Sequence, residues 1–360
     1  MEKHLANLRN LMIKQALDGT LISSVPDIIY LTGFSSFSLY EREAFLLVTK
    51  KNQYIFTDGR YTHAVKTQVD HFQLIEIGAT TPFIKQLEKI IKEEAIEKLG
   101  TDNHNLTAFE FERIKKTVKE TKHFSPSEIR ICKTIDEITK IKQACALGDK
   151  AFSYILKKLK PSMTEKEIAF TLEHFMRKNG ADPSFDTIVA FGENAAVPHH
   201  KISNRKLKTR DLILLDFGIK HENYCSDMTR TIFLGKPTPE QKKVYETVHE
   251  AQQKAIETLK SSLAKPIQAT LVDQAARDYI ISQRYPSIPH SLGHGIGLEV
   301  HEDPTLGPNS EAFLQEGMVF SIEPGIYLPD NFGVRIEDLF AIQNNKLIQL
   351  TQSPSHLIEI

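Results

Sequence analysis

The 360-residue sequence contains few cysteines, no excess of charge of either sign and no long hydrophobic run, and each absence removes a class of protein. Cys132, Cys145 and Cys225 lie far apart and form no Cys-x-x-Cys pair. This spacing excludes a disulfide framework, and it also excludes a thiolate metal site built from neighbouring cysteines. We therefore expect three buried free thiols in a reducing compartment.

The balance of charge argues against polyanionic partners. Lys and Arg number 45 against 46 Asp and Glu, which gives a net charge of -1 and no long-range attraction for nucleic acid or anionic lipid. The sequence from Met1 to His4 runs directly into an amphipathic pattern without the apolar core of a signal peptide. No stretch approaches the roughly 18 apolar residues of a membrane span. We expect a cytoplasmic protein with no membrane partner.

The first third of the chain mixes strand-like and helix-like patterns. Residues 44–49 and 54–57 are predicted to be strands joined as a hairpin, and apolar residues at helical spacing predict helices over 82–99 and 109–118. Pro126 and its serine neighbours then interrupt the periodicity. We predict an α/β domain over residues 1–127 and a second domain over residues 128–360.

The second domain is predicted to repeat one unit of structure. A long helix over 136–159 and a helix opened by the capping box Thr164-x-x-Glu167 precede strand-like segments up to residue 234. Thr238-Pro239 then opens another long helix, and a helix over 271–283 and further strands follow it. Two such units would place their two hairpins in one central cleft.

Each predicted hairpin carries a pair of carboxylates. Asp216 and Asp227 are equidistant from the predicted turn at residues 221–222, so we expect them to face each other directly. Glu323 and Glu337 are equidistant from Asp330 in the second turn. A lone strand aspartate is normally solvated, but Asp216 lies in the apolar run 212–217, where burying an unpaired charge is costly.

Four acids in one cleft would repel one another unless cations neutralise them. His294, which lies among glycines in the segment 291–297, is the fifth candidate ligand. Four carboxylates and one imidazole form a hard donor set that suits Mn(II), Fe(II), Co(II) or Zn(II).

These residues lie in motifs that resemble those of the pita-bread metallopeptidases, in the branch of Xaa-Pro aminopeptidases and Xaa-Pro dipeptidases (prolidases). The resemblance spans the whole chain, and it rests on Leu215-Asp216-Phe217-Gly218, Ser226-Asp227-Met228-Thr229-Arg230-Thr231, His290-x-x-Gly293-His294-Gly295-Ile296-Gly297, Val300-His301-Glu302-x-Pro304, Ile322-Glu323-Pro324-Gly325-Ile326-Tyr327 and Gly333-Val334-Arg335-Ile336-Glu337-Asp338. It implies an α/β creatinase-like N-terminal domain before an α+β pita-bread catalytic domain with an internal pseudo-twofold duplication.

The resemblance also implies a ligand set for two divalent ions, with Mn(II) first and Co(II), Fe(II) or Zn(II) as alternatives. Asp227 and Glu337 would bridge the two ions, and Glu323 would also act as the general base. The complete implied set is Asp216, Asp227, His294, Glu323 and Glu337.

Further site residues follow from the same motifs. The resemblance implies that His199, His290 and His301 bind the scissile carbonyl, stabilise the oxyanion and assist proton transfer to the proline nitrogen. Arg335 would orient a carboxylate ligand or meet the carboxylate of the substrate, and its alternative is a structural ion pair with Asp338 or another acid. His200 is expected to support the site without contacting substrate. Tyr327 is either a hydrogen-bond partner near the site or an ordinary strand tyrosine.

The reaction implied is release of the N-terminal residue from peptides with proline in second place. The motif Asp58-Gly59-Arg60-Tyr61 favours an aminopeptidase, whereas the short connection between Glu323 and Glu337 resembles prolidases restricted to dipeptides. A methionine aminopeptidase would usually lack this N-terminal domain, a creatinase would lack the metal set, and a non-catalytic binding protein would typically have lost ligands. The resemblance also implies a homodimer.

Overall fold

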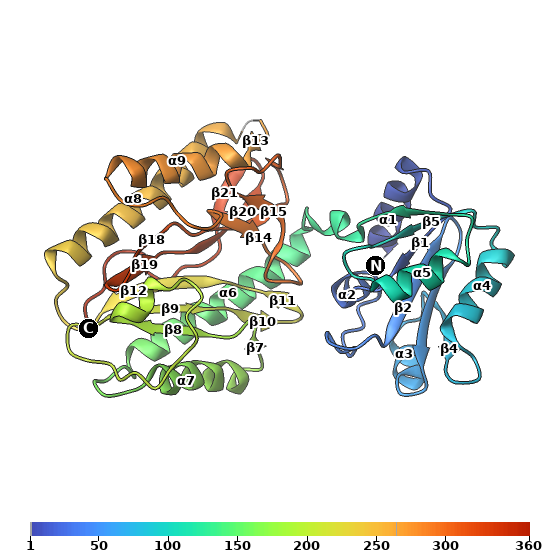
Figure 1. The fold of residues 1–360 in the computed structure, drawn as a ribbon, viewed down its shortest axis with the longest axis horizontal. Helices are drawn as coiled ribbons and strands as arrows, with labels where there is room; N and C mark the ends of the chain where they lie inside the picture. The colour runs from blue at the N-terminus through green and yellow to red at the C-terminus, as the bar shows by residue number, and fades with distance from the viewer. Residues whose placement is uncertain (1, 264) are drawn as a thin grey trace. The chain divides into compact units, whose positions relative to one another are not determined.

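The computed structural model describes residues 2–263 and 265–360, so Met1 and Ala264 lie outside the described residues. The chain divides into two compact units, Met1–Arg130 and Ile131–Ile360 (Figure 1). Each unit has hydrophobic clusters of its own. The boundary predicted after residue 127 lies within the short 3-10 helix η1 (Pro126–Arg130) of the first unit.

The N-terminal unit is built on a six-stranded mixed sheet in the order β4-β3-β2-β1-β5-β6. β1 and β2 pair antiparallel, as do β2 and β3, whereas β1 with β5, β5 with β6 and β3 with β4 pair parallel. The strands are β1 (Gly19–Ile22), β2 (Ala44–Thr49), β3 (Gln53–Asp58), β4 (Gln73–Ile77), β5 (Lys98–Thr101) and β6 (Glu120–His123). The helices are α1 (Glu2–Lys14), α2 (Val25–Thr32), α3 (Thr62–Gln68), α4 (Phe83–Glu93) and α5 (Ala108–Lys115).

The helix predicted over 82–99 is wrong in its second half. α4 ends at Glu93, and Ala95 adopts a left-handed φ of 52° that stops the helix. The chain then enters β5, where Gly100 packs so closely that a Cβ would lie 2.8 Å from Leu17 and 3.0 Å from Phe124. The glycine that resembled a helix end instead permits close packing in a central strand.

The C-terminal unit repeats a pair of helices followed by antiparallel strands, as predicted. The first half of the repeat contains α6 (Ile135–Leu156), α7 (Glu165–Lys178), β7 (Asp182–Pro183), β8 (Ile188–Phe191), the 3-10 helix η2 (Gly192–Ala196), β9 (Leu212–Phe217), β10 (Ile219–His221), β11 (Tyr224–Cys225) and β12 (Met228–Phe233). The second half contains α8 (Pro239–Ser262), the short strand β13 (Ile267–Gln268), α9 (Ala269–Ser282), β14 (Gly293–Gly295), β15 (Glu302–Leu306), β16 (Phe313–Leu314), β17 (Val319–Ile322), β18 (Gly325–Leu328), β19 (Phe332–Arg335), β20 (Asp338–Gln343) and β21 (Lys346–Gln349).

Within this unit the strands lie between the two helix pairs, with α6 and α7 on one side and α8 and α9 on the other (Figure 1). The predicted capping box at Thr164 and the predicted cap at Thr238 are both formed, because each hydroxyl accepts the backbone N–H of the third helical residue, and Thr238 also forms a complete capping box with Gln241. These caps fix where α7 and α8 begin.

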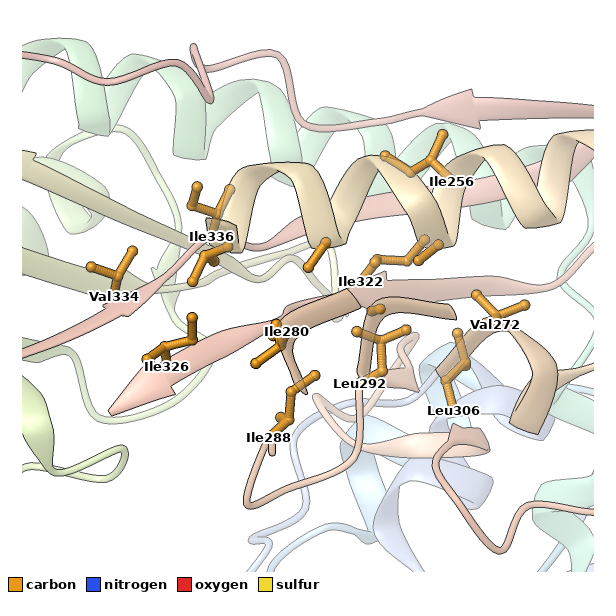
Figure 2. Close-up of a cluster of buried hydrophobic side chains, with 14 of the residues drawn as sticks. Ile256, Val272, Ile280, Ile288, Leu292, Leu306, Ile322, Ile326, Val334 and Ile336 are labelled. Atoms are coloured by element: carbon orange, nitrogen blue, oxygen red, sulfur yellow. The ribbon is translucent and has the colours of Figure 1, made fainter. Parts of the chain in front are cut away.

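The cluster beneath α8 and α9 holds the chain beside two of the predicted ligands, Glu323 directly after β17 and Glu337 between β19 and β20. Figure 2 shows Ile322 and Ile336 pointing into this cluster together with side chains from α8 and α9. Ile322 and Ile336 are buried in this cluster, whereas their chain neighbours Glu323 and Glu337 both contact His294 outside it. Burial of the two isoleucines therefore holds the chain where each acid reaches the site.

Two further expectations from composition can be compared with the structure. Cys145 and Cys225 are buried free thiols as expected, but Cys132 is exposed, which contradicts the expectation that all three are buried. None of the helices within residues 2–263 and 265–360 is long and apolar enough to cross a membrane.

Candidate metal centre

The first hairpin places Asp216 and Asp227 on one face but not directly opposite each other. In the register of β9 and β12, Asp216 faces Thr229, so the predicted direct pairing with Asp227 is wrong. The turn is formed by Glu222 and Asn223, with φ of 47° and 71°, one residue later than predicted. Moving the turn centre by one residue shifts the register by two and preserves the face of every side chain. Asp227 is thus a diagonal neighbour of Asp216.

The second hairpin has the predicted symmetry. Ile322 pairs with Asp338 and Gly325 pairs with Arg335, so both strand pairs are centred on Asp330. Asp330 has φ of 59°, which aspartate tolerates better than most residues. Glu323 and Glu337 lie between these two pairings and therefore at the same level of the hairpin.

Asp227, His294 and Glu337 form a compact group. Each offers a ligand atom, and the three atoms lie within 4.8 Å of one another. Oδ1 of Asp227 and Oε1 of Glu337 are buried, and no donor among the described residues forms a hydrogen bond to either. Unpaired buried oxygens are costly, so these two atoms are suited to receive a cation.

The ring of His294 is oriented as in a typical metal site. Its Nδ1 lies 3.1 Å from the carbonyl oxygen of Gly295, and because a carbonyl only accepts, Nδ1 is the donor. Nε2 then faces the carboxylates, at 3.7 Å from Oδ2 of Asp227 and 3.9 Å from Oε1 of Glu337. A ligand imidazole commonly donates its other N–H to a carbonyl in this way.

Asp216 and Glu323 flank this group, and each already has a partner. Oε1 of Glu323 lies 3.3 Å from Nε2 of His294, and Oδ2 of Asp216 lies 2.5 Å from Nη2 of Arg335. The structure therefore brings all five predicted ligand residues to one site, three as a tight group and two beside it. The ion pair of Arg335 with Asp338 considered above is not formed, since Arg230 pairs with Asp338 at 2.6 Å.

The electrostatics of the group reflect burial and crowding. Burial and the carboxylates of Glu337 and Asp216 raise the pKa of Asp227 well above its ordinary value, and burial with Glu323 and Asp216 does the same to the pKa of Glu337. Burial lowers the pKa of His294, but its bond to Glu323 and the nearby charges outweigh this and raise it to about 9. Burial favours a neutral Glu323, but His294 outweighs burial and lowers the pKa of Glu323.

A threonine that the sequence analysis did not single out connects two site residues. The hydroxyl of Thr229 donates to Oε2 of Glu337 at 2.7 Å and accepts from Nε of Arg335 at 3.1 Å. Thr229 is fully buried and faces Asp216 across the hairpin. Its position in the motif 226–231 was visible, but its partner is 108 positions away in sequence.

A chain of hydrogen bonds links Arg335, Tyr327 and His290. Nη1 of Arg335 donates to the Tyr327 hydroxyl at 2.7 Å, and that hydroxyl lies 3.0 Å from Nε2 of His290. Nδ1 of His290 donates to the carbonyl of Ser291, so in the neutral ring Nε2 accepts the Tyr327 proton. Burial lowers the pKa of His290, which favours that neutral form. Tyr327 is thus a hydrogen-bond partner within the site.

His199 and His301 are the exposed histidines of the site. The ring of His301 meets that of His294 edge to face, with centroids 4.4 Å apart. His199 follows Pro198, whose carbonyl lies 3.4 Å from Nη1 of Arg335. Both side chains are exposed, and the ring of His301 borders the ligand group at His294. Burial raises the pKa of Asp216, and His199 is close enough to that carboxyl to act against the rise.

Profiles of known protein families match both the N-terminal and the C-terminal part of the chain. The sequence profile described as metallopeptidase family M24 matches residues 139–344, and that of the Creatinase/Prolidase N-terminal domain matches residues 4–132. A curated Xaa-Pro dipeptidase of Pyrococcus horikoshii is 35% identical, over 99% of this chain and 99% of its own.

Solved structures show the same likeness. An Xaa-Pro dipeptidase from Bacillus anthracis is 34% identical with a TM-score of 0.92, covering 100% of this chain and 99% of its own. An X-Pro aminopeptidase from Thermotoga maritima is 35% identical with a TM-score of 0.84, covering 96% and 98%. Both Xaa-Pro dipeptidases and an X-Pro aminopeptidase therefore occur among similar chains.

Proposed function

This chain belongs to metallopeptidase family M24, and we propose that it hydrolyses the bond between an N-terminal residue and a following proline. As the motifs predicted, a creatinase-type N-terminal domain precedes a pita-bread catalytic domain. The observation that carries the proposal is the buried group of Asp227, His294 and Glu337, in which two carboxylate oxygens have no donor among the described residues. Relatives named for Xaa-Pro hydrolysis, at about one-third identity over the whole chain, support the substrate class.

Divalent ions would be held by Asp216, Asp227, His294, Glu323 and Glu337, whose oxygen-rich set suits Mn(II) first. Bound ions supply charge that offsets the carboxylates and lower the pKa of water so that it is a nucleophile near neutral pH. The choice of Mn(II), the pair of ions, the homodimer and the cytoplasmic location stay predictions from the sequence.

The chain itself moves protons through Glu323. Its bond from His294 lowers its pKa in the metal-free chain, and bound cations would act in the same direction, so Glu323 is ionised near neutral pH and can accept the proton of the attacking water. Glu323 lies outside the compact group of Asp227, His294 and Glu337, and its side chain is 15% exposed.

The remaining polar side chains bind the substrate. We assign His199 and His301, which are exposed at the site, to the scissile carbonyl and the proline nitrogen. His290 is held by the carbonyl of Ser291 and the Tyr327 hydroxyl, and we assign it to the developing oxyanion, to which its ring can donate once Nε2 carries a proton. Xaa-Pro bonds need such a dedicated site, because the proline ring fixes φ and its nitrogen carries no hydrogen for general peptidases to bind.

An assay of the purified, Mn(II)-supplemented protein on Xaa-Pro, Xaa-Pro-Yaa and Xaa-Ala peptides tests the proposal. We expect cleavage of both proline substrates and very slow cleavage of Xaa-Ala. Comparable rates on Xaa-Ala would refute proline specificity. Cleavage of Xaa-Pro alone would replace the aminopeptidase that we favour with a prolidase, the alternative that the P. horikoshii relative's name supports.

A further inference from the structure

Glu165, the first residue of α7, is fully buried and is the centre of a hydrogen-bond cluster. Oε1 accepts from the backbone N–H of Phe191 at 3.0 Å and from the amide of Asn194 at 2.8 Å. Oε2 accepts from Nε2 of His200 at 2.8 Å, and from the backbone N–H and hydroxyl of Ser203 at 2.9 and 2.6 Å. All of these donors lie on the segment 191–203, which follows β8. One carboxylate therefore ties this whole segment to α7.

The segment carries His199 between two anchors. On one side His200 bonds to Glu165, and because an ionised carboxylate cannot donate, Nε2 of His200 carries the proton. On the other side the carbonyl of Pro198 lies 3.4 Å from Nη1 of Arg335, beside the ligand group. The residues immediately before and after His199 are thus fixed to opposite parts of the domain.

The segment also packs on the second hairpin. A Cβ on Gly333 of β19 would lie 2.0 Å from the carbonyl oxygen of Ala195, so the two backbones are in direct contact. The segment therefore cannot move towards the hairpin, and Glu165 prevents it from moving away. This leaves the backbone of His199 little freedom relative to the carboxylates.

We propose that Glu165 and His200 are positioning residues that hold His199 at the distance from the ligand group needed to bind the scissile peptide. The proposal rests on the function proposed above, in which His199 contacts substrate. It also gives His200, which the sequence analysis expected only to support the site, a specific task.

A carboxylate is required at this position because donors approach both of its oxygens. A glutamine has one side-chain oxygen and one NH2 group. Its NH2 group would face the two donors that now bond to Oε1 or the three that now bond to Oε2, depending on the orientation of the amide. Burial favours a neutral Glu165, but the bonds from Ser203, Asn194, His200 and Phe191 outweigh it and hold the pKa of Glu165 below its ordinary value. Glu165→Gln is thus close to isosteric and selectively disrupts the cluster.

The kinetic test compares Glu165→Gln and His200→Gln with Glu167→Gln. Glu167 lies in the same helical turn and is exposed, and its side chain bonds only to Thr164 among the described residues, so it controls for changes at the start of α7. We expect the first two variants to lower kcat on Xaa-Pro-Yaa by about 10–100-fold through misplacement of His199, with bound metal unchanged. The control should retain wild-type kcat. His200→Gln keeps the test valid if Glu165→Gln fails to fold.

Combination with His199→Ala separates positioning from general stability. If Glu165 acts through His199, then adding Glu165→Gln to His199→Ala lowers kcat no further. An additive loss would overturn the proposal. Wild-type kcat in His199→Ala alone would show that the assigned role of His199 in the proposed function is wrong, whereas wild-type kcat in Glu165→Gln with an impaired His199→Ala would overturn only the positioning role.

A spectroscopic measurement decides the question without turnover. In protein labelled at histidine Cε1, the NMR signal assigned to His199 should shift or broaden in Glu165→Gln and His200→Gln but not in Glu167→Gln. The measurement works on metal-free and metal-loaded protein alike. An unchanged His199 signal in both cluster variants would overturn the proposal, even if the protein proved inactive on proline peptides.

Discussion

Replacing Asp227 by asparagine should have opposite effects on the metal-free and metal-loaded protein. Asp227 is 5% exposed, and no donor among the described residues bonds to its Oδ1. Its neighbours are the carboxylates of Glu337, Asp216 and Glu323, so without a cation its charge is repelled as well as desolvated. Asp227→Asn removes that charge at nearly constant shape. The metal-free variant should therefore be more stable than the metal-free wild type, by about 1–3 kcal/mol.

The loaded protein should respond in the other direction. An ion present at 100 times its Kd adds about 2.7 kcal/mol to the free energy of unfolding of a protein that binds it only when folded. For a catalytic unit spanning residues 131–360, this corresponds to an increase in Tm of about 5–11 °C. Asp227→Asn should abolish most of this increase, because the compact group loses a charged ligand. Peptidase activity should be lost with it.

Differential scanning calorimetry with EDTA and then with excess Mn(II), together with metal analysis, measures both effects. Asp330→Asn is the matched control, since it makes the same chemical change at an exposed turn residue whose left-handed backbone asparagine tolerates. The control should keep the full Mn(II)-dependent increase in Tm and full activity. The assignment of Asp227 as a ligand is refuted if Asp227→Asn shows an undiminished increase and retained activity.

Three further variants test other parts of the site. Thr229→Val removes the hydroxyl that orients Glu337 and should weaken metal binding about 10–100-fold by isothermal titration calorimetry; unchanged affinity would exclude this role. Tyr327→Phe breaks the link to Arg335 and should lower kcat while leaving bound metal unchanged, and an unaltered kcat would contradict the role proposed for that hydroxyl. The folded-state pKa of Glu165 is below its ordinary value of 4.5, so its stabilisation is complete above pH 4.5 and is lost as pH falls through the folded pKa. Wild type should therefore have a larger free energy of unfolding than Glu165→Gln at neutral pH, and urea titrations should show this difference shrinking below pH 4.5. A difference that stays constant with pH would contradict this.

The local sequence pattern was sufficient to predict which face of the hairpin each acidic residue lies on, but it did not predict every cross-strand pairing. The symmetry about Asp330 gives the correct second register, with Glu323 directly after the buried Ile322 at the end of β17. The first register was wrong because Glu222 adopts a left-handed φ, which glutamate rarely does. The error changed the register by two residues, so Asp216 remained on the predicted face.

Contacts between distant segments were beyond the sequence. Thr229 and Glu165 look like an ordinary strand threonine and an ordinary helix N-terminal acid, and only the fold shows that their partners are 108 and up to 38 positions away. Similarly, Lys98–Thr101 lacks the alternation of a half-exposed strand because both of its faces are covered, with Leu99 in a hydrophobic cluster and Gly100 against Leu17 and Phe124. Periodicity records which face is buried and carries no information about which remote group is met there.

The partners of the four acids explain why a cation is needed here. Asp216 is paired with Arg335, and Glu323 is paired with His294, whose pKa is raised to about 9. Asp227 and Glu337 have only the longer contacts of 3.7 and 3.9 Å to the same His294, and of the four acids theirs are the oxygens without hydrogen-bond donors among the described residues. Their combined charge of about -2 when ionised equals what one divalent ion offsets. A second ion would have to take donors from Asp216 and Glu323, so it would compete with Arg335 for Asp216, and the two ions should differ in affinity for that reason.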